Sequence, residues 1–329
     1  MEDGKKIWRI SLLIMLVVFG YLLFFVKKPS LNNPEWGVTF SPMQANDLGL
    51  SWPEVLTGVL DDLGVRHFRL TAPWNSIEPN AGQFDFAALD WQMDEVAKRG
   101  GRVILAIGEK TPRWPECHFT EWMWKLGTTD RQAKILAMLK VVVDRYKDHP
   151  ALDRWQVENE RMLPFGICPR ASFGFLRQEL KEVRQLDPKH EVMTSDSGEL
   201  SSWLRSAAIS DVLPISMYRT VWNKYLGYFV WPLTPTIYFY HANLLSFLVP
   251  KVIVSELQAE PWSDRALTQT SLEIQAKSMN PEIFQKNIIF ARETGFSEIY
   301  LWGAEWWYWM KEKNNQPDYW QEAKKLFQL

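Results

Sequence analysis

The chain has 329 residues, of which 47% are hydrophobic and 23% charged, and a formal net charge of −2. This composition excludes a disordered, collagenous or coiled-coil protein, and the length suffices for one large core or two smaller ones. The near-neutral charge argues against nucleic acid as a partner, because phosphate binding requires a basic surface. The chain is also rich in tryptophan, with 18 residues, which is more aromatic surface than a core requires.

The N-terminus predicts a membrane anchor. A short basic segment at 1–9 precedes 17 apolar or small residues at 10–26, and a linker at 27–35 follows. Such a run lies at the short end of the roughly 17–25 residues that cross a bilayer, and no small-x-small cleavage site follows it, which argues against a cleaved signal peptide. Three basic side chains precede the run and two follow it, so the N-terminus is expected in the cytoplasm. We therefore expect a single-pass protein of the cell membrane with an extracytoplasmic domain at 36–329.

Strand-like and helix-like segments alternate from residue 36 to the end of the chain. The eight strand-like segments are 36–41, 65–71, 102–108, 152–158, 191–196, 212–217, 251–256 and 298–302. Between them, apolar residues recur at helical spacing, as at Leu56, Val59, Leu60 and Leu63. Eight such units predict a (β/α)8 TIM barrel. An open, doubly wound sheet is the alternative, disfavoured because no Gly-x-Gly-x-x-Gly follows the first strand.

Two of these strands end in carboxylates. The fourth strand leads into Glu158, Asn159 and Glu160, and the seventh ends at Glu256. In a TIM barrel the chemistry takes place at the C-terminal ends of the strands, where the fourth and seventh strands face each other. Two carboxylates on opposite sides of a sugar are what glycoside hydrolysis requires. The simpler alternative for either glutamate is an ordinary salt bridge at the rim.

The chain resembles clan A of the glycoside hydrolases, particularly the cellulase-like family 5. The resemblance rests on Asn159-Glu160, Glu256, Trp302 at the end of the eighth strand and the segment 74–90, and it extends over about 36–307. It implies that Glu160 is the general acid/base and Glu256 the nucleophile of a retaining double displacement. Roughly 5–5.5 Å should then separate the two carboxylates, and the pKa of Glu160 should be raised.

The same resemblance implies roles for further residues. Asn159 would hydrogen-bond the sugar 2-hydroxyl, Arg69 would keep the nucleophile ionised, Tyr218 would hydrogen-bond Glu256, and Trp302 would form the floor on which the sugar stacks. The substrate would be an oligosaccharide, a polysaccharide or a glycoconjugate. We expect neither a metal nor an organic cofactor.

One residue departs from the family pattern. Arg161 follows Glu160, where the family commonly has proline, and an inward-pointing cation would keep Glu160 ionised. We expect Arg161 to point away, because successive residues at the end of a strand diverge. By alternation Glu158 should share the direction of Glu160 one layer lower, in a buried salt bridge. Glu260, beyond the seventh strand, either binds a sugar hydroxyl or is solvated.

The loop after the third strand contains Trp114, Cys117 and His118, and Cys168 follows the fourth strand. No second Cys or His stands at ligand spacing, which argues against zinc. Cys117 and Cys168 either form a disulfide or remain free buried thiols. Trp114 and His118 either contact the sugar or pack within the loop.

Two further segments are rich in aromatic residues. Glu305 and Trp306 follow the eighth strand, where they are expected to line the subsite beside Trp302. In the segment 222–249, residues 237–249 are expected to form the sixth barrel helix, and the aromatic loop before it walls the cleft, enters the lipid interface or only covers the barrel. The sequence as a whole predicts a membrane-anchored retaining glycoside hydrolase. A noncatalytic carbohydrate-binding barrel at the membrane surface is the alternative.

Overall fold

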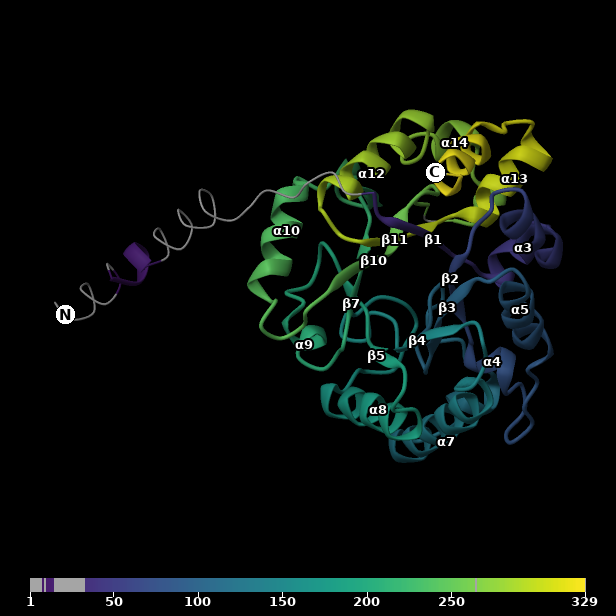
Figure 1. Cartoon of the computed structure of the whole chain (residues 1–329), viewed down its shortest axis with the longest axis vertical. Coiled ribbons are helices and arrows are strands. Elements are labelled where there is room, and N and C mark those ends of the chain that lie inside the picture. The colour runs from purple at the N-terminus through teal and green to yellow at the C-terminus, as the bar shows by residue number, and fades with distance from the viewer. Residues whose placement is uncertain (1–7, 9, 15–32, 264, 329) are drawn as a thin grey trace.

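A ring of parallel strands surrounded by helices forms the architecture of the protein, seen in a computed structural model (Figure 1). The structure describes residues 8, 10–14, 33–263 and 265–328. Most of the predicted membrane span at 10–26 lies outside these residues, as does most of the linker. Within the described part of the chain, no helix combines the length and the apolar character needed to cross a membrane.

The nine-stranded sheet has the order β5-β4-β3-β2-β1-β11-β10-β7-β6. Its strands are β1 (Glu35–Thr39), β2 (His67–Thr71), β3 (Arg102–Ile107), β4 (Leu152–Val157), β5 (Glu191–Met193), β6 (Asp196–Ser197), β7 (Leu213–Met217), β10 (Val252–Gln258) and β11 (Glu298–Trp302). The strands at the two ends of this order, β5 and β6, are separated in the chain only by Thr194 and Ser195. They act as one interrupted strand, which closes the sheet into a ring. The eight expected strands are present, and the fifth is divided into β5 and β6. The sequence did not predict the antiparallel hairpin of β8 (Thr220–Asn223) and β9 (Gly227–Val230).

Helices cover the outside of the ring (Figure 1). They are α2 (Pro42–Asp47), α3 (Trp52–Asp61), α4 (Trp74–Ile77), α5 (Ala87–Lys98), α6 (Glu121–Trp124), α7 (Thr128–Tyr146), α8 (Phe173–Leu186), α9 (Leu204–Ala207), α10 (Pro235–Leu244), α11 (Leu272–Gln275), α12 (Pro281–Glu293), α13 (Ala304–Asn314) and α14 (Asp318–Phe327). Helix α8 shows why such segments form: the Ser172 side chain caps its first turn by accepting a hydrogen bond from the Phe175 amide, and Leu176, Leu180 and Val183 form its buried face.

The strands alternate between two apolar clusters. In β3, Val103 and Leu105 pack in the large cluster between sheet and helices, whereas Ile104 belongs to a small separate cluster with Met193 and Tyr300. Alternation along a strand places these two sets on opposite faces of the sheet. The small cluster therefore fills the interior of the ring, below the polar residues at the C-terminal ends of the strands.

Candidate active site

Glu256 lies near the C-terminal end of β10, where both of its carboxylate oxygens are bonded. Arg69 Nη1 of β2 is 2.6 Å from Oε1, and the Tyr218 hydroxyl donates to Oε2 at 2.9 Å. Burial, together with Glu256, holds the pKa of the Tyr218 hydroxyl well above its usual range, so the phenol keeps the proton that it donates. Both contacts expected around Glu256 are thus present.

Arg69 is fully buried and binds three acceptors, two from the end of β4 and the residues after it and one from β10. Besides Glu256, Nε donates to Gln156 Oε1 at 2.8 Å and Nη2 donates to Asn159 Oδ1 at 2.8 Å. The Ser195 hydroxyl donates to the same Asn159 oxygen at 2.8 Å. These bonds fix the orientation of the Asn159 amide. Neither Gln156 nor Ser195 was predicted from the sequence to be part of the site.

Glu160 is buried, with a different set of partners. The Ser216 hydroxyl donates to its Oε1 at 2.6 Å, and the Glu160 backbone N–H donates to Ser195 Oγ at 2.9 Å. Burial, reinforced by the negative charge of Glu256, raises the pKa of Glu160 to about 7. Ser216 is also the ladder neighbour of Glu256, and neighbouring strands lie about 4.8 Å apart. The two glutamates therefore belong to one site with unequal surroundings.

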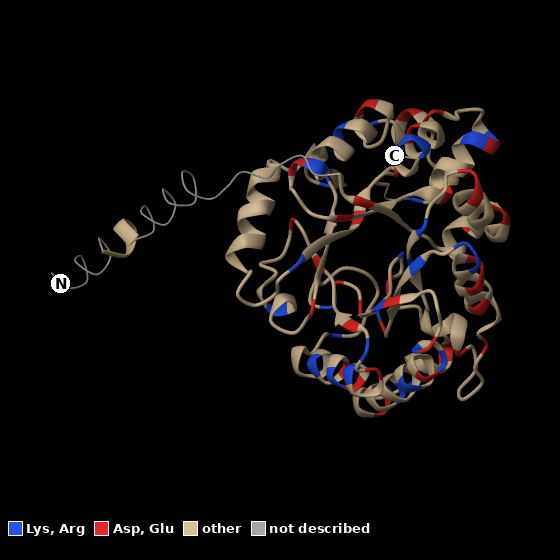
Figure 2. Ribbon diagram, in the orientation of Figure 1, with Lys and Arg blue, Asp and Glu red and all other residues tan. Residues whose placement is uncertain are grey.

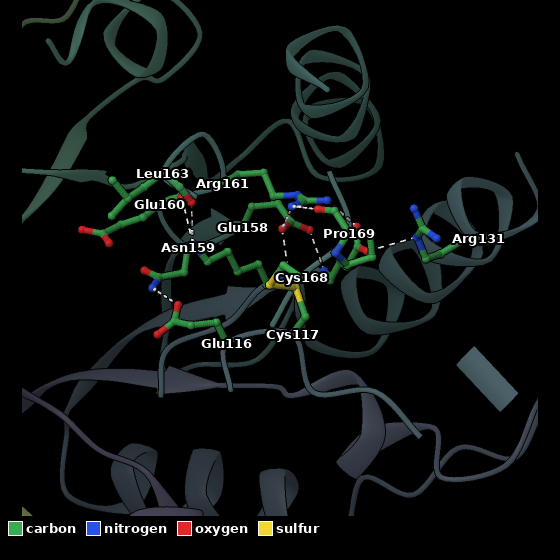
Figure 3. Close-up of a disulfide and its surroundings, with 12 residues drawn as sticks. Glu116, Cys117, Arg131, Glu158, Asn159, Glu160, Arg161, Leu163, Cys168 and Pro169 are labelled. Atoms are coloured by element: carbon green, nitrogen blue, oxygen red, sulfur yellow. Dashed lines mark hydrogen bonds and ion pairs between the residues drawn. A yellow bond between two sulfur atoms is a disulfide. The ribbon is translucent and has the colours of Figure 1, made fainter. Parts of the chain in front are cut away.

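The backbone changes direction directly after β4. The φ angles of Glu158 and Glu160 are 63° and 42°, in the left-handed region that non-glycine residues rarely adopt. Strand alternation therefore ends at Val157, and the expectation that Glu158 points in the same direction as Glu160 is wrong. Figure 3 shows Glu160 pointing to one side and Arg161 to the other. Residues held in this region concentrate at functional sites.

Arg161 turns away from Glu160 as expected, but it remains inside the protein. Its Nη2 donates to Glu109 Oε2 at 2.8 Å. Its Nε is 3.4 Å from Oε2 of Glu158, which lies beside it in Figure 3. The Glu158 carboxylate also accepts the backbone N–H groups of Glu109 and Lys110. Glu158 thus forms the expected buried salt bridge, and the cation that follows Glu160 is neutralised elsewhere.

A third carboxyl group, Glu116, lies in the site and was missed by the sequence analysis. Asn159 Nδ2 donates to Glu116 Oε2 at 3.1 Å. Burial raises the pKa of Glu116 to about 8, against the opposing effect of Lys110. The disulfide between the next residue, Cys117, and Cys168 ties its loop to the loop after β4 (Figure 3). In the sequence, only the position of Glu116 beside Cys117 pointed to a place in the site.

Trp302, at the end of β11, is held by charged groups. Its indole N–H donates to Glu260 Oε1 at 2.8 Å, and the Arg113 guanidinium lies 3.9 Å from its ring centroid. Arg113 pairs with Glu260 and, at 3.3 Å, with Glu305 Oε2. Glu260 is thus buried rather than solvated. Glu305 lies beneath Arg113, and its burial raises its pKa to about 7.

Two predicted sugar contacts do not face the site in the free protein. Trp306 is buried, its indole N–H donates to Gln275 Oε1 at 2.8 Å, and its ring centroid is 4.5 Å from that of Tyr319. It lies in α13, whose side chains pack against neighbouring helices. His118 is buried beneath its own loop, and this burial lowers its pKa. Trp114, by contrast, is 60% exposed.

The described residues contain no group of three or more His, Cys, Asp and Glu side chains arranged to hold a metal ion. The polar groups of the site are engaged with one another through hydrogen bonds and ion pairs. Acid–base and nucleophilic chemistry by carboxyl groups is what such a set can perform.

Comparison with known proteins relates this arrangement to glycoside hydrolases. Residues 56–194 match the model of glycoside hydrolase family 42, described as beta-galactosidase. Beta-galactosidase Pbg of Clostridium perfringens is 29% identical over 167 residues, which are 44% of this chain and 24% of that enzyme. The chain thus spans about a quarter of the length of this relative.

Solved structures extend the likeness over most of the barrel. The cold-adapted beta-galactosidase of Rahnella sp. R3 aligns with a TM-score of 0.61 and 13% identity, over 92% of this chain and 57% of that one. The GH5_18 protein of Bifidobacterium longum aligns with a TM-score of 0.57 and 16% identity, over 82% and 70%. The fold is a TIM barrel, as in these glycoside hydrolases. The matching family model is that of family 42, and a GH5_18 structure aligns as well, so particular closeness to family 5 stays a prediction.

Proposed function

We propose that the protein is a retaining glycoside hydrolase with Glu256 as nucleophile and Glu160 as general acid/base. The observation that carries this proposal is the contrast between the two groups. Glu256 accepts from Arg69 and Tyr218, donors that favour an ionised carboxylate. Glu160 accepts from the neutral Ser216 hydroxyl, and burial raises its pKa to about 7, which suits proton transfer in both directions near neutral pH. The glycosidase names of the relatives support the same reaction.

The reaction follows in two displacements. In the first, a Glu256 oxygen bonds to the anomeric carbon while the glycosidic bond breaks and Glu160 gives its proton to the leaving oxygen. In the second, Glu160 takes a proton from water, whose oxygen displaces Glu256 from the sugar. We expect the Asn159 amide, whose oxygen accepts from Arg69, to donate to the sugar 2-hydroxyl through the N–H that is not bonded to Glu116. The substrate is an oligosaccharide, a polysaccharide or a glycoconjugate, and neither metal nor organic cofactor takes part.

Covalent trapping tests the proposal. The purified protein is incubated with activated 2-fluoro-β-galactosides and 2-fluoro-β-mannosides, and mass spectrometry is expected to locate one fluorosugar on Glu256. Glu256→Gln is the unlabelled control. Glu160→Ala should lose activity on natural glycosides yet retain activity on dinitrophenyl glycosides, with partial rescue by azide. Binding of glycans without labelling or turnover across the panel would instead favour the noncatalytic carbohydrate-binding barrel.

We also propose that residues 10–26 anchor the protein in the cell membrane as a single span, with the barrel outside the cytoplasm. The uninterrupted apolar run supports a span, and the positive charges around it support this orientation. The disulfide between Cys117 and Cys168 supports the same compartment, since such bonds persist mainly where conditions are oxidising.

The side of the barrel formed by α10 is the part that we propose to contact lipid. Residues 220–250 contain one charged side chain, Lys224, among many aromatic residues. Ile237 and Leu244 are exposed on α10, seven residues apart, and Phe247 in the turn directly after the helix is 76% exposed. Figure 2 shows no charged residue on α10, whereas the other long helices have several. Trp, Tyr and apolar side chains favour the membrane interface, and the short linker at 27–35 keeps the barrel close to it.

A further inference from the structure

A row of aromatic rings leads from the nucleophile to the surface. Tyr218, which donates to Glu256, lies 5.3 Å from Trp262 between ring centroids. Trp262 lies 6.2 Å from Phe165, and Phe165 lies 5.9 Å from Trp114. Exposure rises along this row, to 39% at Phe165 and 60% at Trp114. We call these four residues the aromatic row.

The outer end of the aromatic row is built on the disulfide. Trp114 and Phe165 stand three residues before Cys117 and Cys168 respectively, so the bond between the cysteines holds the two rings on adjoining loops. The Ile167 backbone N–H donates to the Pro115 carbonyl at 3.0 Å and ties the loops together a second time. Two exposed rings are thereby held in place without being buried. Such preorganisation lowers the ordering cost of binding a ligand.

The neighbouring groups indicate a neutral, amphipathic ligand. Arg113, next to Trp114, is neutralised by Glu260 and Glu305, and Glu116 accepts a hydrogen bond from Asn159. No free charge on these groups would attract an ion. A pyranose offers a face of C–H groups that can pack on an aromatic ring, and hydroxyls around its edge that remain in water or meet polar groups.

We propose that Trp114 and Phe165 form a distal subsite for a sugar unit remote from the bond that is cleaved. The enzyme then prefers glycan chains to single-sugar glycosides. The inference rests on the proposed glycosidase function, because the aromatic row is continuous with Glu256 through Tyr218. A sugar bound between Glu160 and Glu256 leaves the rest of its chain along the aromatic row.

The test compares substrates of different length. KM and kcat are measured for 4-nitrophenyl β-galactoside and β-mannoside, and for β-1,4-linked galacto- and manno-oligosaccharides from the disaccharide to the pentasaccharide. Trp114→Ala and Phe165→Ala are each expected to raise KM about five- to tenfold for the longest chains that are hydrolysed, with little change in kcat. Activity on the nitrophenyl glycosides should be unchanged, which also shows that each variant is folded.

Trp124→Ala is the matched control. Trp124 is 50% exposed and packs on Phe119 at 4.8 Å, outside the aromatic row, so its removal should leave KM unchanged for every chain length. The double variant Cys117→Ser/Cys168→Ser should raise KM for long chains, as the ring variants do. An unchanged KM in both ring variants, or an equal rise for nitrophenyl glycosides and pentasaccharides, overturns the proposal.

The two proposals can fail separately. Labelling of Glu256 without any length dependence removes the distal subsite and leaves the glycosidase. If nothing is hydrolysed, calorimetric titration with the same oligosaccharides tests the distal subsite on its own. An affinity that increases with chain length and is lost in Trp114→Ala supports the subsite. Affinity that is absent, or independent of length, overturns it.

Discussion

At the scale of single residues, the two glutamates differ because of what surrounds them. Both are buried, but a guanidinium and a phenol bind Glu256, whereas a serine hydroxyl binds Glu160. In a buried site, a nearby negative charge raises the pKa of a carboxyl group, which then holds its proton more tightly. One residue type can therefore serve as nucleophile at one position and as acid at another.

The raised pKa of Glu160 predicts a pH limit on activity. The protonated form needed for glycosylation is present below about pH 7 and is lost as the pH rises through that value, so kcat/KM for glycosides with poor leaving groups should fall above about pH 7. The pH profile measures this. Glu160→Ala, assayed with a dinitrophenyl glycoside, should lack the decline, whereas Glu116→Gln should keep it. The same decline in Glu160→Ala would assign it to another group.

Arg69 should not tolerate replacement by lysine. Its three nitrogens bind Glu256, Gln156 and Asn159, and a single ammonium cannot reach all three acceptors. We expect Arg69→Lys to lower kcat about 100-fold, the order of loss seen when one preorganised donor is removed. Steady-state kinetics measure the effect, and an unchanged circular dichroism spectrum shows that the fold persists. A kcat near that of the unaltered protein would contradict the role of Arg69.

At the scale of elements, the ends of strands and the loops beyond them determine the site. The interrupted strand between β5 and β6 places Ser195 beside Asn159, and the left-handed residues after β4 separate Glu160 from Arg161. By contrast, the helix after β11 removes Trp306 from the site, because its side chain packs against α11 and α14.

Trp306 should therefore matter for stability rather than for substrate binding. Trp306→Ala removes a buried indole, and we expect it to lower the free energy of unfolding by about 3–5 kcal/mol with an unchanged KM. Urea unfolding and steady-state kinetics measure the two effects. A raised KM in Trp306→Ala, without loss of stability, would contradict this prediction and indicate that Trp306 contacts the substrate.

Trp302→Phe should instead affect catalysis: we expect it to raise KM or lower kcat, because the hydrogen bond from the indole to Glu260 is lost.

At the scale of the whole molecule, the question is how the barrel meets the membrane. The full chain should float with lipid vesicles in a density gradient, and removal of residues 1–29 should release most of it. A weaker association of the shortened protein should remain if α10 contacts lipid, and Phe247→Asp should abolish it. Trp124→Asp is the control, since Trp124 is 50% exposed on α6, which packs on α4 across the ring from α10 (Figure 1). A shortened protein found wholly in the soluble fraction would exclude contact through α10, and a full chain that does not float would exclude the anchor.

The sequence by itself determined the architecture and the principal candidates of the site. The eight strands follow from local apolar patterns, and the end of each parallel strand identifies the rim on which Glu160 and Glu256 lie. The partners of Glu256, Arg69 in β2 and Tyr218 directly after β7, were predicted from the resemblance to clan A glycoside hydrolases. The strands and the rim depend on order along the chain and on spacing, both of which a sequence displays, whereas the roles of the site residues were expected from the resemblance.

The tertiary structure alone decided how distant segments meet. It paired Cys117 with Cys168, brought Glu116 to Asn159, and placed Arg161 among buried acids. It also buried Trp306 in the packing between helices. Each result depends on loop geometry or on contacts between residues far apart in the chain, and neither periodicity nor the order of motifs contains that information.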